Sequence, residues 1–348
     1  MQKKDIVDLI RYHADKDDAG FKEKAFEIAR YFDKIGDRAL ADYIMGLLSN
    51  NNVFAPQSIS RNFSFIKEDE GNDNETLLLP DAIANDIKGL VRAFSKNMGI
   101  NKILFEGKPG TGKTKTARWL AKITDRRLYS IEIREIIDSK MGQTAKNLAM
   151  VFDELKHVPH PEKLLFLIDE IDALALDRIN ENDLREMGRV TSSLLGELDV
   201  LSNDVLLIAT TNLYASLDKA LQRRFDVTIS FNRYSTEDLA EILCETYKNY
   251  AIKAEMDSYD RRLLKKIALT SERMPMPGEI TNIVKTALAF SDESDPNDSL
   301  RLIYSKLNNK KPTSELLEEK GFTLRESALL LKISKTQVAR ILAKDTNE

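Results

Sequence analysis

The residues best suited to chemistry form the run GKPGTGKT at 107–114, in which Gly107, Gly112, Lys113 and Thr114 follow the spacing Gly-x-x-x-x-Gly-Lys-Thr. Glycines let backbone N–H groups surround phosphate oxygens, because they carry no side chain to obstruct the approach. The lysine can then reach the β- and γ-phosphates, and the threonine hydroxyl can ligate Mg²⁺. The run therefore predicts a nucleotide phosphate site, whose other contact residues are Pro109, Gly110 and Thr111.

Two adjacent carboxylates end the apolar run LLFLIDE at 164–170. We expect Asp169 to hold the Mg²⁺ shell together with Thr114, and Glu170 to orient and activate the attacking water. A solvated acidic turn is the alternative interpretation of the same pair. Asp172, two residues later, is interpreted as structural.

Polar groups also mark the next two apolar runs. Asn212 ends the run VLLIATTN and can complete a water-positioning network beside Glu170, although Asn after a strand is usually a turn residue. Arg223 and Arg224 come just before the run VTISF. Phosphoryl transfer needs extra positive charge where the γ-phosphate departs, and these arginines can supply it. A solvated surface pair is the alternative.

Short apolar runs alternate with helical patterns between residues 81 and 231. Runs that are apolar on both faces and separated by helices are typical of a parallel sheet covered on two sides. The phosphate loop follows one such run and precedes a helical stretch, as its chemistry requires. We therefore predict an α/β core with the parallel sheet of a P-loop nucleotide-binding fold. The predicted strands are NKILFEG (101–107), RLYSIEI (127–133), LLFLIDE (164–170), VLLIATTN (205–212) and VTISF (227–231).

The N-terminal part of the chain is predicted to be helical. In residues 1–50, apolar residues recur at helical spacing over 21–32 and again over 40–48, which predicts a small helical hairpin. Residues 51–80 are predicted to be a linker, because KEDEGNDNET at 67–76 carries five acidic residues against one lysine.

Helical patterns also fill the chain after the predicted sheet. Residues 232–308 form a predicted helical lid, whose first helix has Ser235 as its N-cap. LNNKKP at 307–312 is interpreted as a second linker, and it separates the lid from a last helical unit at 313–348.

The stretch TLRESALLLKISKTQVARIL at 323–342 resembles a helix-turn-helix, with Ala328 where the helices cross and Lys332 where glycine is usual. Residues 310–348 hold eight basic and six acidic residues, a balance of +2 that is modest for a DNA contact. A helical oligomerisation or protein-docking module is the alternative. On the DNA interpretation, the residues facing a major groove are Ser334, Lys335, Thr336, Gln337 and Arg340.

In their order and spacing, GKPGTGKT, LLFLIDE, ATTN and LDKALQRRFD resemble the AAA ATPases over roughly residues 80–300. The resemblance implies ATP and Mg²⁺ as cofactors. It also implies a Walker A pair at the start of the helical run after the first predicted strand, a Walker B pair at the end of the third strand and a sensor 1 residue at the end of the fourth. These roles are carried over to Lys113 and Thr114, to Asp169 and Glu170, and to Asn212.

The same resemblance implies that the ATP site is shared between subunits of a ring, usually a hexamer. Arg223 and Arg224 match the arginine fingers that reach into the neighbouring subunit. MPGEITNIVK at 276–285 resembles the lid segment in which Gly278 stands at the sensor 2 position, so no sensor 2 arginine is expected.

One segment departs from the family pattern. IIDSKMGQTAKNLAMVF at 136–152 resembles the segment with the first pore loop, but Lys140 stands where an aromatic residue is usual. An aromatic ring grips a polypeptide by apolar contact, whereas lysine presents a hydrated charge. Lys140 could instead meet an acidic segment or a phosphate backbone, and a plain surface lysine is the alternative. AFEIARYFDKIGDRALADYIMGLL and KMGQTAKN resemble a bacterial AAA group often paired with a subtilisin-like serine protease.

Composition excludes several classes of protein. The 348 residues carry 52 basic and 56 acidic side chains, a net charge of −4 that gives no reason to expect nonspecific adhesion to nucleic acid. No apolar run approaches the ~20 residues of a membrane span, and the N-terminus lacks the pattern of a secretory signal. The single cysteine, Cys244, and three histidines predict no disulfide and no structural metal, so we expect a cytoplasmic protein.

The sequence thus predicts an ATP-hydrolysing ring that remodels or regulates a protein partner, with a subtilisin-like protease as the partner implied by resemblance. The alternative is an ATP-switched DNA-binding regulator that uses its C-terminal helix-turn-helix. A nucleotide-binding scaffold with negligible turnover is a third possibility, against which the presence of Glu170 argues.

Overall fold

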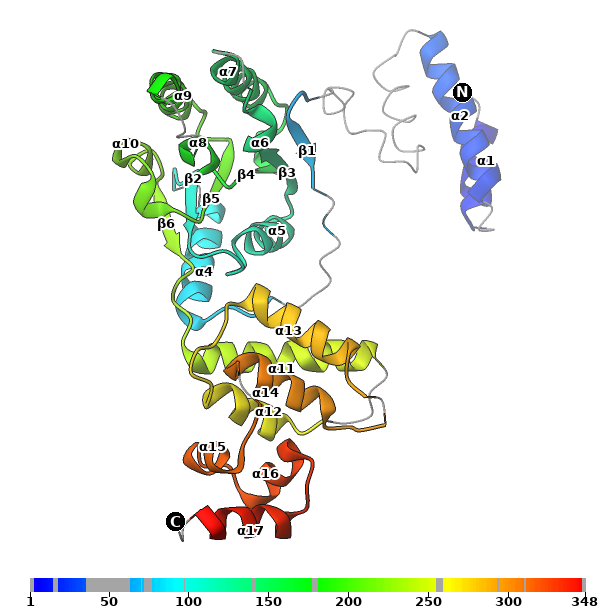
Figure 1. Cartoon of the computed structure of the whole chain (residues 1–348). Coiled ribbons are helices and arrows are strands. Elements are labelled where there is room, and N and C mark those ends of the chain that lie inside the picture. The colour runs from blue at the N-terminus through cyan, green and yellow to red at the C-terminus, as the bar shows by residue number, and fades with distance from the viewer. Residues whose placement is uncertain are drawn as a thin grey trace. The chain divides into compact units, whose positions relative to one another are not determined.

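The computed structural model describes residues 3–14, 18–35, 63–69, 71, 77–96, 98–138, 142–176, 181–254, 259–292, 294–309 and 311–345. These residues fall into two compact units. One contains the described residues up to Phe63 together with 157–159, and the other contains the rest of the described chain (Figure 1).

The N-terminal unit contains helices α1 (Lys3–Ala14) and α2 (Asp18–Lys34), which pack against each other. Ala25 and Ala29 of α2 are buried, and Lys24 of α2 forms an ion pair with Asp5 of α1 at 3.0 Å. The predicted helix over 21–32 therefore lies within α2. Its predicted partner over 40–48 lies outside the described residues, and α1 was not predicted.

A six-stranded sheet in the order β1-β3-β4-β5-β2-β6 forms the centre of the larger unit (Figure 1). Every neighbouring pair is parallel except β1 with β3. The five strands predicted from the sequence are confirmed, and the three central ones, β4, β5 and β2, are buried on both faces. The strands are β1 (Ile66–Glu68), β2 (Lys102–Glu106), β3 (Arg127–Glu132), β4 (Leu164–Asp169), β5 (Leu206–Thr211) and β6 (Val227–Ser230).

Strand β1 was not predicted, since it lies in the segment interpreted as a linker. Ile66 is buried and stands opposite Ile131 in the antiparallel register with β3. Asp69, just after β1, forms an ion pair with Arg118 at 2.9 Å. The segment 51–80, expected to be a linker, therefore contains a strand, whose three residues are too few to produce a recognisable period.

Helices cover both faces of the sheet. On one face, α4 and α5 share a core with alternate strand residues such as Ile103, Phe105 and Leu167. The intervening strand residues, such as Leu104 and Phe166, point to the other face and are equally buried. The helices of this core are α4 (Asp81–Ser95), α5 (Lys113–Ile123), α6 (Ile133–Ile136), α7 (Gln143–Lys156), α8 (Ala173–Leu176), α9 (Glu181–Asp199) and α10 (Lys219–Gln222), with short 3₁₀ turns at Pro161–Lys163 and Tyr214–Ser216.

The predicted lid is helical. It consists of α11 (Thr236–Lys253), α12 (Arg261–Leu269), α13 (Pro277–Ala289) and α14 (Asp298–Asn308). Ser235 caps α11 as predicted, in a reciprocal capping box with Asp238. The helices surround buried side chains that include Tyr247, Leu264 and Tyr304.

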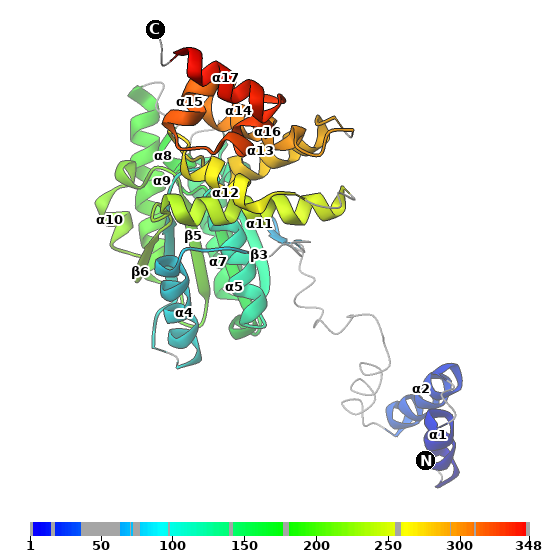
Figure 2. The same cartoon turned by 90° about the horizontal axis from the view of Figure 1, so that it is seen from below.

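The C-terminal segment forms α15 (Ser314–Glu319), α16 (Leu324–Leu331) and α17 (Lys335–Asp345), which lie next to the lid in both views (Figures 1 and 2). Leu317, Phe322 and Leu330 belong to the same buried cluster as the lid helices. The expected boundary at 307–312 therefore does not separate two cores. Hydrophobic spacing along the chain could not show this, because the cluster is formed by residues far apart in sequence.

The turn between α16 and α17 begins with a residue of unusual backbone conformation. Lys332 adopts a left-handed conformation, with φ at 57°, which glycine reaches at lower cost. The residue at the position where glycine is usual thus keeps the geometry that glycine would have.

Candidate functional site

The predicted phosphate loop connects β2 to α5 and has the conformation its glycines allow. Gly110 and Gly112 have φ values of 75° and 92°, in the left-handed region that favours glycine. At Gly107 a Cβ atom would lie 2.9 Å from the Cβ of Phe231, so this position has no room for a side chain. Gly112 is the N-cap of α5, so the positive end of the helix dipole faces the loop.

Lys113 is buried, with 7% of its surface exposed, and its ammonium group has neutral oxygen partners. The Nζ atom donates to the carbonyl oxygens of Gly107 at 2.7 Å and Lys108 at 3.0 Å, and to Oδ1 of Asn212 at 2.8 Å. Burial lowers the pKa of Lys113, and the nearby carboxylates of Asp169 and Asp172 oppose that shift. The structure therefore brings the predicted phosphate-binding lysine and sensor 1 asparagine into direct contact.

Thr114 and Asp169, the predicted Mg²⁺ ligands, also lie together. The hydroxyl of Thr114 donates to the Asp169 carboxylate at 3.1 and 3.2 Å, and the hydroxyl of Thr210 on β5 donates to the same carboxylate at 2.6 Å. Thr210 was missed in the sequence, although it stands two residues before Asn212. Hydroxyl and carboxylate oxygens are ligands that Mg²⁺ accepts.

The protein side of this metal site is sparse. No group of three or more His, Cys, Asp or Glu side chains in the described part of the chain could hold a metal ion. A hydroxyl and one carboxylate fit Mg²⁺, which usually takes one or two protein ligands and completes its shell with phosphate and water oxygens. The donor set therefore suits a metal that arrives with a phosphorylated substrate.

Glu170 follows Asp169 at the end of β4 and has a left-handed backbone, with φ at 54°. Its backbone N–H donates to the Thr210 hydroxyl at 3.0 Å. Its carboxylate accepts a hydrogen bond from Nη2 of Arg134 at 2.6 Å, whereas Asn212 is bound to Lys113. The structure thus places Glu170 against Arg134, a partner that the sequence did not suggest.

Asp172 has the structural role that the sequence suggested, since it holds the backbone beside Asn212. It is buried, with 4% exposed, and its Oδ1 accepts the backbone N–H of Asn212 at 3.0 Å. This contact fixes the backbone at the end of β5. The register that pairs Ile168 with Ala209 brings the ends of β4 and β5 side by side, so the carboxylates and Asn212 meet there.

A cleft of about 430 Å³ lies between the phosphate loop and the lid. Of the predicted site residues, Pro109 to Thr114, Asp169, Glu170 and Asn212 line it, and Gly107 supports it from behind. Of the opposite wall, the sequence pointed only to Gly278, since the other residues come from the segment before α4 and from parts of the lid without a recognisable motif. That wall contains Leu77, Leu78, Tyr234, Ile242, Thr246, Asn249, Tyr250, Pro277, Gly278 and Thr281.

The lid meets the loop at two polar contacts. The backbone N–H of Gly278, at the start of α13, donates to the carbonyl oxygen of Gly110 at 2.8 Å. The Tyr234 hydroxyl donates to the carbonyl oxygen of Thr111 at 2.8 Å, and burial raises the pKa of that hydroxyl far above its usual value. Both contacts place the lid directly above the predicted phosphate positions.

Arg223 and Arg224 do not line the cleft of their own chain. Arg224 forms a two-pronged ion pair with Asp199, at 2.8 and 2.9 Å, which lowers the pKa of Asp199 and raises that of Arg224. Arg223, at the end of α10, is exposed. The structure therefore separates the two arginines from the other predicted site residues.

Beside the cleft lies a recess of about 330 Å³ on the far side of Glu170. Arg118 and Arg134 line it together with Asp69, Asp169 and Glu170, and Arg118 also lines the cleft. Arg118 lies on α5 and Arg134 on α6, and nothing in their spacing indicated that both line one recess with Glu170.

Residues 103–233 match the family "ATPase family associated with various cellular activities (AAA)". The chain is 33% identical over 193 residues to the uncharacterized AAA family ATPase y4kL of Sinorhizobium fredii, covering 53% of this chain and 57% of that one. It is 27% identical over 229 residues to a Methanocaldococcus jannaschii protein named as a homologue of a 26S proteasome regulatory subunit, covering 65% and 59%. The chain spans a little over half the length of these relatives.

Among solved structures, the AAA domain of FIGL-1 in complex with ADP aligns with a TM-score of 0.53 and 17% identity. The alignment covers 76% of this chain and 94% of that one. At this identity the likeness concerns the fold, a mixed α/β sheet domain with helices. Separately, none of the helices described here is long and apolar enough to cross a membrane.

The contact between loop and lid predicts an effect of Gly278→Ala. The new Cβ would lie 3.0 Å from the Gly110 Cα atom and 3.3 Å from its carbonyl oxygen, and this backbone cannot move without disturbing the loop. We expect nucleotide to bind about tenfold more weakly, a cost of about 1.4 kcal/mol, in a calorimetric titration.

Gly89→Ala on α4 is the matched control, because no atom lies within 4 Å of its new Cβ. This variant should keep the parent affinity and gain slightly in stability. Equal affinities for both variants and the parent would show that the lid does not press on the loop at Gly278.

Proposed function

We propose that this chain, whose residues 103–233 form an AAA family ATPase domain, binds and hydrolyses ATP in the cleft beneath the lid. One observation carries the proposal: the ends of three adjacent strands bring Lys113 to Asn212 and Thr114 to Asp169 through hydrogen bonds of 2.8 to 3.2 Å. These are the groups that phosphoryl transfer requires, and they converge at one end of the sheet.

Lys113 supplies the first step, the capture of the triphosphate. Its three hydrogen-bond partners in the structure are neutral oxygens, namely two carbonyls and the Asn212 amide. Phosphate oxygens carry charge and bind an ammonium group more strongly. ATP would therefore take over these hydrogen bonds, and it would offset the burial that lowers the pKa of Lys113.

Thr114 and Asp169 would hold Mg²⁺, which when bound neutralises charge on the phosphates. Thr210 fixes the Asp169 carboxylate through its 2.6 Å hydrogen bond, so the carboxylate is already oriented. Glu170 then activates the attacking water. Arg134 occupies its Oε2 atom, which leaves Oε1 to accept the proton.

We further propose that the chain works as a ring, in which an arginine of one subunit completes the site of the next. Two observations support this. Both predicted arginines lie away from their own cleft. Among the described residues that line the cleft, the cationic side chains are Lys113, Lys115 and Arg118. Arg223 is the better candidate, since Asp199 already holds Arg224. A hexamer is the ring size that the family resemblance implies.

The substrate of such a ring would be a protein. The relatives include a protein named as a homologue of a 26S proteasome regulatory subunit and the peroxisomal ATPase PEX6 of Kluyveromyces lactis. We propose a protein-remodelling role in the cytoplasm, with a subtilisin-like serine protease as the partner suggested by the sequence. Lys140 of the predicted pore loop lies outside the described residues, so its contact with polypeptide or nucleic acid stays a prediction.

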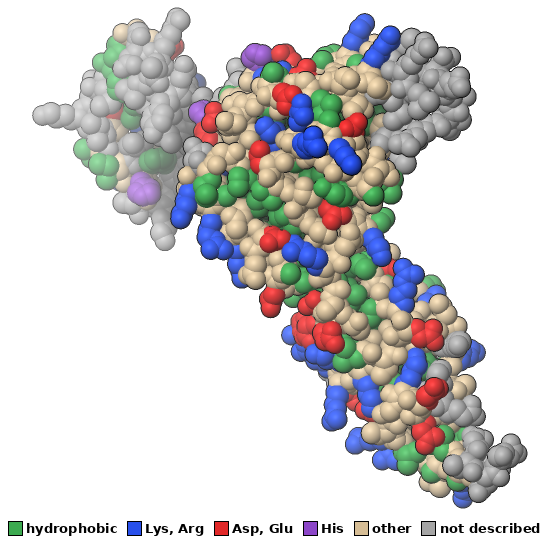
Figure 3. Space-filling model, turned by 90° about the vertical axis from the view of Figure 1, so that its left-hand side faces the viewer, with side chains coloured by type: hydrophobic (Ala, Val, Ile, Leu, Met, Phe, Trp, Pro, Cys, Tyr) green, Lys and Arg blue, Asp and Glu red, His purple; other side chains and the backbone are tan. Residues whose placement is uncertain are grey.

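A second candidate function is DNA binding by the C-terminal helices. It is favoured by the tight turn at Lys332 and by the exposure of the residues predicted to face a groove. One of them, Gln337, also accepts the Ser334 N–H in a local cap, which leaves its amide N–H groups available. The charge is mixed, because lysine and arginine side chains alternate with acidic ones over the lid and C-terminal helices at the bottom of Figure 3.

Glu170→Gln tests the assigned chemistry. The amide cannot accept a proton from water, so we expect hydrolysis to fall by a factor of 10² or more while ATP binding and assembly persist. A coupled phosphate-release assay measures hydrolysis, and light scattering measures assembly. Glu135→Gln, an exposed acid on α6, is the control and should leave turnover unchanged. Parent-like turnover in Glu170→Gln would remove Glu170 from the mechanism.

A mixing experiment tests the shared site. Lys113→Ala and Arg223→Ala should each be inactive alone, because one lacks a phosphate ligand and the other the arginine for its neighbour. In equal mixtures about a quarter of the interfaces join an intact pocket to an intact arginine, so activity should return to that fraction. Mixtures as inactive as the separate variants would contradict a site built from two subunits.

Point variants test the DNA candidate more cleanly than a deletion would, because residues 313–348 contribute Leu317, Phe322 and Leu330 to the lid core. Lys335→Ala and Arg340→Ala should each lower the slope of log affinity against log salt by about one in fluorescence anisotropy with duplex DNA. Arg262→Ala, exposed on α12, should have no effect. Absence of salt-dependent binding by the parent rejects this function.

A further inference from the structure

The C-terminal helices and the lid share one hydrophobic core. Leu317 of α15, Phe322 of the following turn and Leu330 of α16 are between 0% and 7% exposed and belong to the cluster that contains Tyr304 of α14. Phe322 and Tyr304 meet edge to face, with ring centroids 6.2 Å apart. Separating the two parts would therefore expose large apolar side chains on both.

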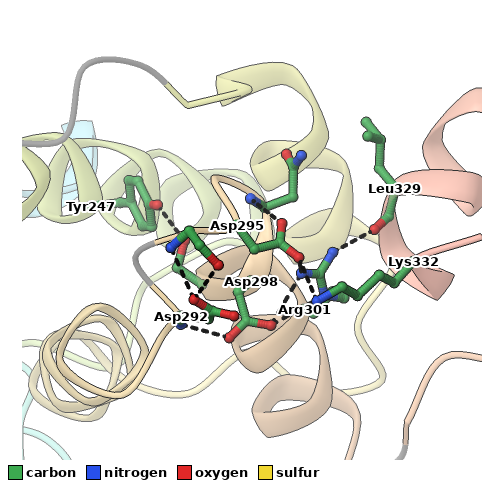
Figure 4. Close-up of polar contacts among 10 residues, drawn as sticks. Tyr247, Asp292, Asp295, Asp298, Arg301, Leu329 and Lys332 are labelled. Carbon is green, nitrogen blue, oxygen red and sulfur yellow. Dashed lines mark hydrogen bonds and ion pairs between the residues drawn. The ribbon is translucent and has the colours of Figure 1, made fainter.

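A polar network crosses the same boundary (Figure 4). Arg301 of α14 donates to the carbonyl oxygen of Leu329 on α16 at 2.9 Å. It also pairs with Asp295 in the loop before α14 and with Asp298, the first residue of α14. Lys332, in the turn between α16 and α17, reaches Asp295 at 3.0 Å. Asp295 thus forms ion pairs both with Arg301 of the lid and with Lys332 of the turn before α17.

Two members of this network are shielded from water, whereas the third, Lys332, is 65% exposed. The side chains of Arg301 and Asp295 are 13% and 16% exposed. Burial acts to raise the pKa of Asp295, but hydrogen bonds from Lys332 and the Asn297 N–H and the charge of Arg301 outweigh it, so that pKa lies below its usual value. The carboxylate is therefore ionised at neutral pH, and its stabilising effect is lost only as pH falls through that lowered pKa.

A second link lies nearby. Lys266 of α12 pairs with Glu326 of α16 at 2.6 Å, and its ammonium group stands 5.0 Å from the centre of the Phe322 ring. Glu326 also closes the capping box of α16 with Thr323. Of the lid helices, α12 thus contacts the start of α16, and α14 contacts its end.

The opposite side of the lid meets the nucleotide cleft. Ile242, Thr246 and Tyr250 of α11 line the cleft, and Gly278 of α13 bonds to the phosphate loop. Helix α13 packs against both α11 and α14, and α14 packs against α16. Packed side chains therefore run without interruption from the cleft to the turn before α17.

We propose that α15–α17 and the lid are one cooperative unit, so that nucleotide in the cleft stabilises α16 as much as it stabilises α14, through the Arg301–Asp295–Lys332 network. The inference rests on the proposed function, since it needs a nucleotide in this cleft. If α15–α17 were only tethered to the lid, nucleotide in the cleft would leave the opening of α16 unchanged.

Amide hydrogen exchange of the full chain, with and without saturating ADP, tests this proposal. ADP held between loop and lid stabilises the lid, so amides that exchange through its opening slow down. We expect α14 and α16 to slow by the same factor, about tenfold or more. Helices α1 and α2 should not respond, since they belong to the other unit.

Two variants locate the coupling. Asp295→Asn keeps the size of the side chain but removes the charge shared by Arg301 and Lys332, so the response of α16 should fall to less than half that of α14. Lys332→Ala, which removes the more exposed partner, should have a smaller effect in the same direction. Arg261→Ala, which breaks exposed ion pairs between α11 and α12, is the control and should leave the two responses equal.

Each outcome is decisive. Slowing of α14 without slowing of α16 in the parent overturns the single cooperative unit. Equal responses in Asp295→Asn overturn the role of the network and leave the apolar core as the link. If the amides of residues 107–114 fail to respond to ADP, the proposed nucleotide site itself is wrong, and the coupling falls with it.

Discussion

A buried ammonium group is the constraint on which the rest of the site depends. Lys113 can stay charged beneath the lid because the Gly107 and Lys108 carbonyl oxygens and Asn212 surround it, while Asp169 opposes the fall in its pKa. Those carbonyls can point inward because the loop is rich in glycine. The parallel sheet then brings Asn212 and Asp169 within reach. A triphosphate that replaces the neutral partners finds a positive charge already in place.

The lid makes this site a cleft and not an open groove. One of its contacts, at 2.8 Å, joins two backbones, those of Gly278 and Gly110, and these atoms cannot change rotamer. Tyr234 adds a hydrogen bond to the same loop from the segment that leads into the lid. Such contacts transmit small displacements well, because packed backbone has little freedom to absorb them.

Beyond the lid, the C-terminal helices extend the same packed structure. Leu317 and Leu330 complete a core that α11–α14 would otherwise leave open, and Arg301 ties the end of α16 to the lid. The segment whose sequence resembles an independent DNA-binding module thus shares its hydrophobic core with the helices above the cleft.

The sequence alone determined the strands, the phosphate loop and the polar residues that end β4 and β5, because these features are local: a period, a glycine spacing, a carboxylate after an apolar run. The tertiary structure decided which groups meet. It set Glu170 against Arg134, gave β1 its place beside β3, and merged the C-terminal helices with the lid. Those outcomes depend on register and packing between distant segments, which no local pattern encodes.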